Sequence, residues 1–303
     1  MLERLATKTW RFLKGNIFPK AEGKNPSGGF SFKNTIGLII NVFAWREKVV
    51  FFPNDPWRFK LRFLLNWHEP ESVKACKEII KPGMNVLDIG AHLGYYSRLF
   101  SKLVGPSGTV YAFEPDPPTY KLLVSNISLP KFKNITVIDK AVSDASGKLD
   151  FFEMAASGKH SFYDVSQSLA NIDPESYLFK DRLSVEAITV DSFLERAGNT
   201  KIDFIKMDIE GAEPRALRGM QKTISRSHGL TLLVELNDGS LRAGGSSAGE
   251  FLKQLQEFGF EVKKILDAEG KIKSVGQLQA VQAEDGYVNL LCKKENILKP
   301  TAS

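Results

Sequence analysis

From residue 70 onward the chain alternates between apolar runs of strand length and stretches with helical periodicity. Near-continuous apolar strands separated by helices are typical of a parallel sheet that helices cover on both faces. The apolar runs predict five such strands, at residues 85–90, 109–114, 134–139, 202–208 and 230–235. The stretches between them predict helices at residues 70–80, 95–103, 117–127, 213–225 and 247–258. This alternation predicts an α/β fold.

Two later runs and one long interruption complete the pattern. Residues 260–266 and 287–293 are expected to add two closing strands, the last of them antiparallel, so that the sheet has seven strands. Residues 153–188 break the alternation and are too many for an ordinary connection. Long insertions in such folds tend to be lids or substrate loops, and we expect the same here.

The N-terminal part of the chain is basic and irregular. Residues 1–80 carry 14 Lys and Arg against 7 Asp and Glu, although the net charge of the whole chain is only +6. We therefore expect a basic extension or cap over residues 1–68 and an enzyme domain over residues 69–298. Residues 2–14 place apolar side chains at helical spacing among four basic ones. This segment could lie on an anionic membrane, pack against the enzyme domain or form a disordered arm.

The composition argues against several classes of protein. No apolar run approaches the roughly 18 residues of a membrane span, and the first fifteen residues lack the apolar centre of a secretory signal. Cys76 and Cys292 have no metal-binding spacing, and the four histidines form no zinc pattern. We expect a cytoplasmic protein without a disulfide framework or a structural zinc ion, at most peripheral to the inner face of the membrane.

Every one of the five predicted strands ends at or near an acidic residue. In an open α/β sheet, ligands bind beyond the carboxyl ends of the strands. The first strand ends in a turn in which Asp88 precedes Gly90 and Gly94, and we expect these glycines to let a ligand approach the backbone. The acid suits a cationic amino group, and Glu114 could hold both hydroxyls of a ribose. An adenosine ligand with an ammonium group and no pyrophosphate is S-adenosylmethionine; a nicotinamide dinucleotide and purely structural turns are the alternatives.

A second acidic group follows the fourth strand. Asp208, Glu210 and Glu213 lie within six residues of one another, so their repulsion should raise at least one pKa or require a cation. Glu213, followed by Pro214, could instead simply favour the N-terminus of a helix.

The motifs of residues 68–236 resemble those of one enzyme family. They are HEP (68–70), VLDIGAHLG (86–94), AFEPDP (112–117), SNI (125–127), KAVSD (140–144), TVDSF (189–193), KMDIEGAEPRALRG (206–219) and VEL (234–236). In this order and spacing they resemble the FkbM family of S-adenosylmethionine-dependent methyltransferases, although that family usually has Asn where His92 stands. The resemblance implies a Rossmann-like class I methyltransferase fold.

The resemblance also implies roles for individual residues in binding S-adenosylmethionine. Contacts with its methionine portion are expected from Asp88, Gly90, His92 and Gly94. Glu114 would bind the ribose. Asp139, Ala141 and Val142 would frame the edge of the adenine, unless Asp139 is merely a solvated strand end.

Catalysis is expected to involve the acids that follow the fourth and fifth strands, Asp208, Glu210 and Glu235. One hypothesis makes Asp208 or Glu210 a general base with a raised pKa. A second, which we do not favour, places Mg²⁺ among Asp208, Asn237 and Asp238. A third attributes catalysis to alignment alone. Glu69 and His160 are candidate substrate contacts, although His160 could equally be a surface residue.

The expected activity is O-methylation of a hydroxyl on a sugar, a glycan or a natural product. The alternatives are an N-methyltransferase acting on a small amine and a catalytically inactive module that binds the cofactor; the intact Asp208 and Glu210 pair argues against the latter. Nucleic-acid substrates are not expected, because residues 116–120 (DPPTY) depart from the amino-methylating motif and follow the second strand. No cysteine nucleophile lies near the fourth strand either. The acceptor and the oligomeric state cannot be read from these motifs.

Overall fold

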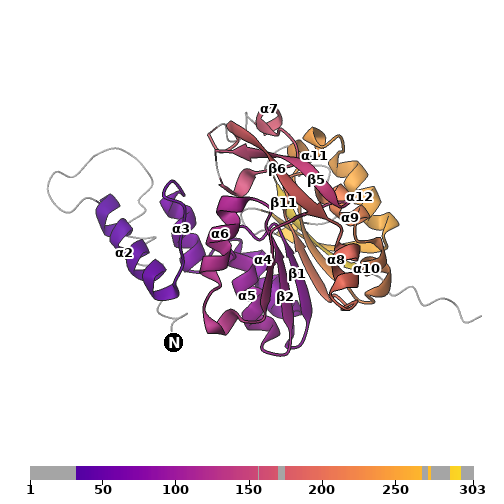
Figure 1. Cartoon of the computed structure of the whole chain (residues 1–303), viewed down its shortest axis with the longest axis horizontal. Helices are drawn as coiled ribbons and strands as arrows, with labels where there is room; N and C mark the ends of the chain where they lie inside the picture. The colour runs from indigo at the N-terminus through magenta and orange to yellow at the C-terminus, as the bar shows by residue number, and fades with distance from the viewer. Residues whose placement is uncertain (1–31, 156, 170–174, 268–271, 274–286, 295–303) are drawn as a thin grey trace, which may run out of the picture. The chain divides into compact units, whose positions relative to one another are not determined.

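The computed structural model describes residues 32–155, 157–169, 175–267, 272–273 and 287–294 (Figure 1). The chain divides into two compact units, one of residues 1–47 and 56–68 and the other of residues 48–55 and 69–303. The described part of the first unit contains helices α2 (Phe32–Glu47) and α3 (Trp57–Leu64). Residues 2–14 lie outside the described residues. No helix among the described residues has the length and apolar character needed to cross a membrane.

The second unit is built on a mostly parallel sheet. Its strands follow the order β10-β9-β11-β8-β7-β1-β2-β3. Their bounds are β1 Asn85–Ile89, β2 Thr109–Phe113, β3 Ile135–Ile138, β7 Phe204–Met207, β8 Thr231–Leu236, β9 Phe260–Asp267, β10 Ile272–Lys273 and β11 Val288–Lys294. The strands β3, β2, β1, β7 and β8 are mutually parallel, whereas β11 runs antiparallel to both β8 and β9. All seven predicted strands are confirmed, and the two-residue β10 extends the edge beyond them.

Helices flank this sheet on both sides (Figure 1). On one side lie α4 (Pro70–Ile79), α5 (Tyr95–Val104) and α6 (Pro117–Asn126), and on the other α8 (Val190–Arg196), α9 (Glu213–Arg218), α10 (Gln221–Arg226) and α12 (Ala248–Glu257). Three shorter helices, α7 (Ser166–Leu169), α11 (Asp238–Ala243) and the 3₁₀ helix η1 (Pro130–Phe132), lie in connections. The single helix predicted at 213–225 is wrong, because α9 ends at Arg218 and α10 begins at Gln221. Between them, a Cβ atom on Gly219 would lie 1.9 Å from the Ser143 carbonyl oxygen, so only glycine fits there.

The predicted insertion at 153–188 begins and ends in strands of a second sheet. Strands β4 (Ala141–Val142), β5 (Gly147–Met154) and β6 (Phe179–Ile188) pair in the order β4-β6-β5. The antiparallel pair β5 and β6 runs from Gly147 opposite Ala187 to Met154 opposite Phe179. Only two of the eight residues of β5 and three of the ten of β6 are buried, without a regular alternation, so neither strand has a clear signal in the sequence. Between them lies the 3₁₀ helix η2 (Ser157–Lys159).

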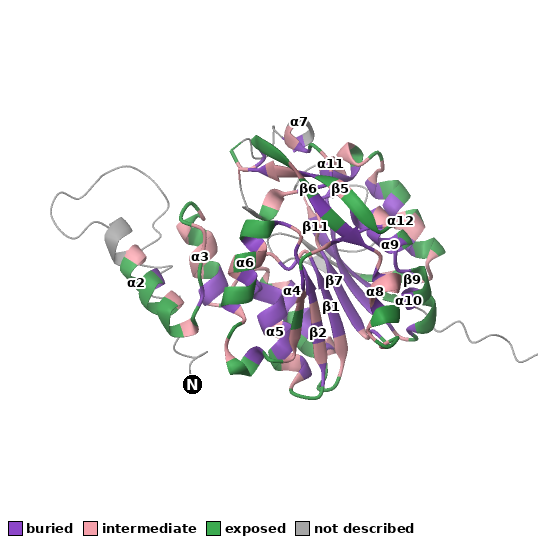
Figure 2. Ribbon diagram, viewed as in Figure 1, coloured by how far each residue is buried: buried purple, intermediate pink, exposed green. Residues whose placement is uncertain are grey.

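The core surrounds the central strands of the main sheet, where buried residues concentrate (Figure 2). All four residues of β7 and all six of β8 are buried, as expected for strands that helices cover on both faces. Two of these buried residues are charged, Lys206 in β7 and Glu235 in β8. Buried charges require partners, so these two residues mark the place where the fold departs from an ordinary core.

The turn between β1 and α5 depends on two glycines in the left-handed region, Gly90 (φ +83°) and Gly94 (φ +87°). A Cβ atom on Gly90 would lie 1.9 Å from the backbone oxygen of Asp208, and one on Gly94 would lie 2.7 Å from Leu123 Cδ1. Protein atoms therefore occupy the space beside both glycines. The glycines therefore have a structural role here, and close approach of a ligand to this turn stays a prediction.

This contact predicts a large cost for a side chain at residue 90. Gly90→Ala should lower the free energy of unfolding by roughly 3 kcal/mol or more, because it adds a backbone clash to the left-handed strain. Gly198→Ala is the matched control, since Gly198 has φ +82° and nothing lies within 4 Å of its added Cβ; it should cost about 1 kcal/mol. Urea unfolding of both variants measures the difference. Equal losses would mean that β7 can move away from the turn.

Candidate functional site

The carboxyl ends of β1, β7 and β8 bring charged side chains together. Asp88 in β1 lies opposite Lys206 in the neighbouring β7, so the two side chains point to the same face of the sheet. The Nζ atom of Lys206 lies 3.0 Å from Asp208 Oδ2 and 5.2 Å from the centre of the Tyr96 ring. A buried ammonium group is thus surrounded by two carboxylates and an aromatic face, which offset its loss of hydration.

Beyond this lysine lies a group of three acids that we call the acid cluster: Asp208, Glu210 and Glu235. One carboxylate oxygen from each lies within 4.8 Å of the other two. Lys159 Nζ lies 2.6 Å from Glu210 Oε1, and the Ser240 hydroxyl donates to Glu210 Oε2 at 3.1 Å. The structure therefore brings together the three predicted catalytic residues, and it gives two of them a lysine partner.

Glu235 differs from the other two acids. Its Oε1 atom is buried and has no hydrogen-bond partner among the described residues. Burial, reinforced by the nearby Asp208 carboxylate, raises the pKa of Glu235 well above its ordinary value. Glu235 is thus the member of the acid cluster whose oxygen is available to accept a proton.

The composition of the cluster bears on the Mg²⁺ hypothesis. Three carboxylates at this spacing could hold a divalent ion, but two ammonium groups already contact two of them. The other expected ligands have different partners: Asn237 accepts from Ser240 N at 3.2 Å and caps α11, whereas Asp238 accepts from Ala248 N and Arg242 Nε, both at 2.7 Å. Asn237 and Asp238 thus have structural roles beside these helices, and the Mg²⁺ hypothesis stays a prediction.

Glu213 is part of the turn that supports the cluster. It is the first residue of α9, and its carboxylate accepts from the backbone N–H groups of Ile209 and Gly211, each at 2.9 Å. These bonds support the structural interpretation of Glu213, which braces the chain on either side of Glu210.

The residues expected to hold S-adenosylmethionine lie around the β1 turn and fit that ligand. Glu114 accepts from the backbone N–H of His92 at Oε2 (2.9 Å) and from that of Asp116 at Oε1 (3.0 Å). Each oxygen keeps a second lone pair that could accept a ribose hydroxyl. Asp88 is fully buried; its Oδ2 accepts from the Ser97 hydroxyl at 2.5 Å, and its Oδ1 has no partner among the described residues.

The expected adenine edge is less open. Asp139 follows β3 and is exposed, which fits both a solvated strand end and a ligand contact. Ala141 and Val142 form β4, and each is packed in a hydrophobic cluster. Any adenine contact from these two residues would therefore come from their backbone.

The two expected substrate contacts are placed differently. Glu69, the residue before α4, accepts at Oε2 from the Tyr96 hydroxyl (2.7 Å) and from Asn289 Nδ2 (2.9 Å). Asn289 lies opposite Glu235 in the sheet, so Glu69 belongs to the surroundings of the acid cluster. His160 accepts from the Met154 N–H at Nδ1 (3.0 Å), and burial lowers its pKa. This bond anchors the η2 segment, and a substrate contact by His160 stays a prediction.

Sequence reasoning missed the two lysines of the site. Lys206 carries a recognisable signal, a charge inside an apolar strand, whereas Lys159 in the insertion carries none. Lys159 lies 5.3 Å from the centre of the Tyr177 ring and 5.7 Å from that of Tyr287. Next to it, a Cβ on Gly158 would lie 3.7 Å from the His92 imidazole. The insertion therefore reaches both the β1 turn and the acid cluster.

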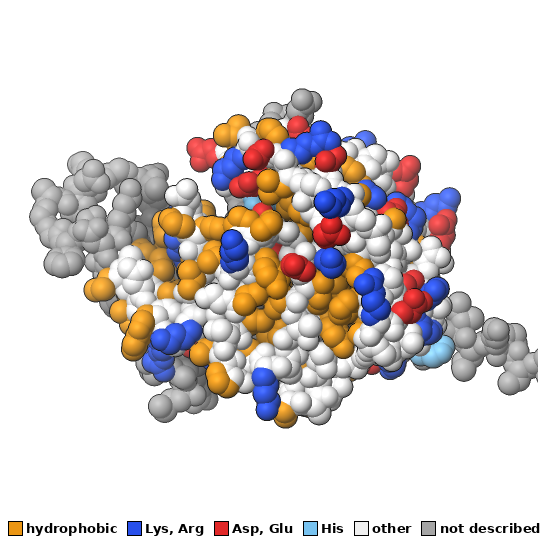
Figure 3. Space-filling model, viewed as in Figure 1, with side chains coloured by type: hydrophobic (Ala, Val, Ile, Leu, Met, Phe, Trp, Pro, Cys, Tyr) orange, Lys and Arg blue, Asp and Glu red, His pale blue; other side chains and the backbone are white. Residues whose placement is uncertain are grey.

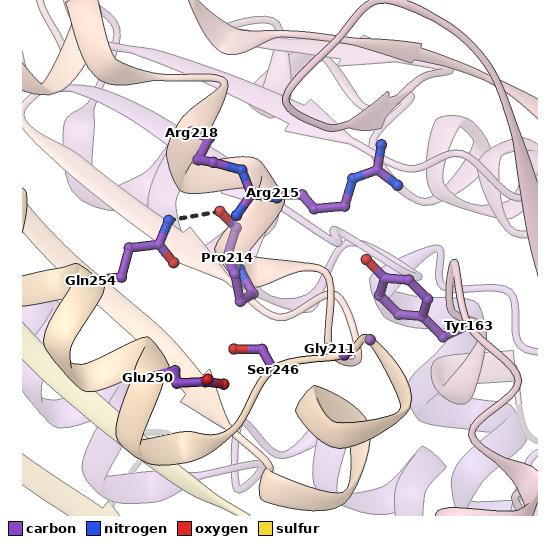
Figure 4. A pocket seen from close by; sticks show the side chains of 10 residues that line it. Tyr163, Gly211, Pro214, Arg215, Arg218, Ser246, Glu250 and Gln254 are labelled. Atoms are coloured by element: carbon purple, nitrogen blue, oxygen red, sulfur yellow. Dashed lines mark hydrogen bonds between the residues drawn. The ribbon is translucent and has the colours of Figure 1, made fainter.

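A separate pocket of about 360 Å³ lies beside this site (Figure 4). Its lining residues are mostly polar: Tyr163, Gly211, Pro214, Arg215, Arg218, Gly244, Gly245, Ser246, Glu250 and Gln254. Arg215 and Arg218 both bind the Asp144 carboxylate, and Gln254 Nε2 donates to the Pro214 carbonyl at 3.0 Å. The acid cluster does not line the pocket, but Gly211, the residue after Glu210, does.

Comparison with known proteins assigns the family. The model of the methyltransferase FkbM domain matches residues 88–262, which include the β1 turn and the acid cluster. The chain belongs to the FkbM methyltransferase family. It is therefore an S-adenosylmethionine-dependent methyltransferase, and the family resemblance drawn from the motifs is confirmed.

Individual relatives are distant. The chain is 28% identical over 198 residues to the 2-O-methyltransferase NoeI of Sinorhizobium fredii, which covers 62% of this chain and 79% of NoeI. It is 26% identical over 165 residues to the 31-O-demethyl-FK506 methyltransferase FkbM of Streptomyces tacrolimicus, covering 47% and 61%. A crystal structure of a SAM-dependent methyltransferase from Aquifex aeolicus has a TM-score of 0.41 at 17% identity, covering 84% of this chain and 98% of that one.

The Glu114 geometry predicts a loss of cofactor affinity. Glu114→Ala should weaken binding of S-adenosylhomocysteine by roughly 1–3 kcal/mol, because it leaves the ribose hydroxyls without their acceptor. Calorimetry on the variant and on Glu186→Ala, an exposed acid of β6, makes the comparison. Unchanged affinity in a folded Glu114→Ala protein would remove the ribose assignment.

The buried acids predict that stability falls as pH rises. Burial raises the pKa of both Glu114 and Glu213 to about 8, so the folded state holds protons that the unfolded state releases near pH 4.5. The stabilisation is complete below pH 4.5 and lost as pH rises through 8. Between pH 6.5 and 8.5 the free energy of unfolding should fall by on the order of 3 kcal/mol, because His160, with an ordinary pKa of 6.5, offsets only a small part of the fall. Denaturant unfolding measures this slope, and Glu213→Gln should reduce it. A rising slope would contradict the burial argument.

Proposed function

We propose that this methyltransferase methylates a hydroxyl group of a sugar, a glycan or a natural product. The observation that carries the proposal is the unpartnered Oε1 atom of Glu235 in the acid cluster. A base at the acceptor assists removal of the hydroxyl proton, and burial, which raises the pKa of Glu235, makes its carboxylate a stronger base. The printed names of NoeI and FkbM, each an O-methyltransferase, also support this proposal.

In this proposal, some residues of the site bind the cofactor and others take up the proton of the acceptor. S-adenosylmethionine, when bound, supplies an electrophilic methyl group on a good leaving group. Asp88 and Glu114 would hold its methionine and ribose portions. The protein's remaining task is to align the acceptor and take its proton. This assigns the two ends of the site to different strands, β1 and β2 for binding and β7 and β8 for chemistry.

Within the acid cluster we assign the base to Glu235 in preference to Asp208 or Glu210. An ammonium group at hydrogen-bond distance stabilises a carboxylate in its ionised form and makes it a weaker base. Lys206 contacts Asp208 in this way, and Lys159 lowers the pKa of Glu210, although burial still raises that pKa overall. These two ion pairs would instead fix the acids as hydrogen-bond acceptors that orient the acceptor molecule.

A carbohydrate acceptor is supported by the polar pocket beside Glu210. Carbohydrate surfaces combine hydroxyls with apolar faces, and the pocket offers the Tyr163 ring with planar polar groups of Arg215, Arg218 and Gln254 (Figure 4). An acceptor that extends from the acid cluster past Gly211 would reach this pocket. We propose that the acceptor is a small molecule or a glycan and not a nucleic acid. We also propose a cytoplasmic location, with which the two buried free thiols are compatible.

Replacing the base should separate catalysis from binding. Glu235→Gln should lower turnover by about 100-fold or more, the contribution of general-base catalysis, while the affinity for S-adenosylhomocysteine changes little. Turnover is followed by mass spectrometry of extracts incubated with isotope-labelled S-adenosylmethionine, and Glu195→Gln, an exposed acid of α8, is the control.

Three outcomes would overturn parts of this assignment. Near-normal turnover of Glu235→Gln would leave alignment as the catalytic device. Loss of turnover in EDTA with recovery in Mg²⁺ would establish the metal hypothesis. A labelled methyl group on a nitrogen atom of the product would favour an N-methyltransferase. The absence of a labelled product with any extract would favour an inactive module.

A further inference from the structure

Helix α2 exposes an unusual amount of apolar surface. Five of its large apolar side chains are exposed: Leu38 (62%), Ile39 (37%), Val42 (54%), Phe43 (39%) and Trp45 (72%). Elsewhere, the large exposed apolar residues of the described chain are Val50, Val124, Leu178 and Phe179, which belong to other segments. Single exposed apolar residues are ordinary, but five on one helix form a patch that calls for a partner.

The spacing of these residues makes one continuous face. Leu38, Val42 and Trp45 follow one another at intervals of four and three residues, so they form a stripe along the helix. Ile39 and Phe43, four residues apart, form the adjoining stripe. Ile40, which points away from both stripes, is buried. With 16 residues α2 is about 24 Å long, less than the apolar thickness of a bilayer, so this face suits a surface that it lies on and does not cross.

The charges of the described first unit are mostly positive. The described residues of the first unit, 32–47 and 56–68, contain five Lys and Arg against one Glu. Arg46 is exposed beside Trp45 at the end of α2, and Arg58 and Arg62 are exposed one turn apart on α3. Apolar and basic side chains both reach the surface in the region of these helices (Figure 3). Arg next to Trp is typical of segments at a membrane–water interface.

We propose that α2 and α3 bind an anionic lipid surface. The apolar face of α2, led by Leu38, Val42 and Trp45, enters the boundary between headgroups and acyl chains. Arg58 and Arg62 meet the lipid phosphates. A second copy of the chain fits this surface less well, because pairing two such faces would bring two sets of net positive charge together. This surface consists of other residues than segment 2–14, and it does not depend on the identity of the methyl acceptor.

Vesicle sedimentation of the full chain tests the proposal. The wild-type protein should sediment with phosphatidylcholine vesicles that contain phosphatidylglycerol, and less with pure phosphatidylcholine or at high salt. Leu38→Ser combined with Val42→Ser should weaken binding by about tenfold or more. Arg58→Gln combined with Arg62→Gln should weaken it by a similar factor and remove part of the salt dependence.

Matched controls separate this surface from general stickiness. Leu178→Ser removes an equally exposed leucine (63%) from the second unit and should leave vesicle binding unchanged. All variants should bind S-adenosylhomocysteine like the wild type, which shows that they are folded. The proposal is overturned if the wild type does not bind anionic vesicles, if the α2 variant binds as well as the wild type, or if Leu178→Ser loses as much. It is also overturned if light scattering shows a dimer that the α2 variant abolishes while vesicle binding stays absent.

Discussion

The burial of Lys206 in the central strand β7 sets the conditions for the rest of the site. An ammonium group inside a sheet is tolerated only where opposite charges surround it. Asp88 on the neighbouring strand and Asp208 beyond the end of β7 provide those charges, and the Tyr96 ring covers another side. These carboxylates in turn must stay close to the Lys206 ammonium group, because moving either one away would leave a buried charge without its partner. The same electrostatic requirement thus fixes Asp88, the acid proposed to bind the cofactor, and Asp208 of the acid cluster relative to each other.

Backbone strain concentrates in the same region. Among the described residues, six non-glycine residues have positive φ, and three of them, Glu69, His92 and Glu210, belong to the site. Such conformations cost free energy and persist only where surrounding interactions hold them. Glu210 is held by Lys159 and Ser240, and the His92 N–H by Glu114. Because Lys159 comes from the segment between β5 and β6, the second sheet helps to hold a strained residue of the main sheet's active edge.

The sequence predicted an element well where burial on both faces left a continuous apolar run. It predicted poorly where apolar and polar residues are mixed in one strand. Central strands such as β7 and β8 are buried on both faces, so their apolar runs predicted them well, and the acids at their ends located the site. β5 and β6 are half exposed, and their mixed residues hid a sheet inside a predicted loop. Gly219 lies against the Ser143 carbonyl, about 75 positions away in the chain, and no local pattern contains this contact. Lys159 acquires its partner Glu210 in the same way, through the fold alone.

Three buried carboxylate oxygens without partners among the described residues, on Asp88, Asp116 and Glu235, all lie at the carboxyl edge of the sheet. An unpaired buried acceptor costs the fold free energy, so native cores rarely keep one without a functional reason. Asp116 was not among the predicted site residues; it caps α6 through Oδ2, which accepts from the Thr119 N–H and hydroxyl, and this leaves Oδ1 unpaired. Donors that arrive with a ligand, such as ammonium and hydroxyl groups, would satisfy oxygens of this kind. The fold therefore gives up stability at the positions where binding can recover it.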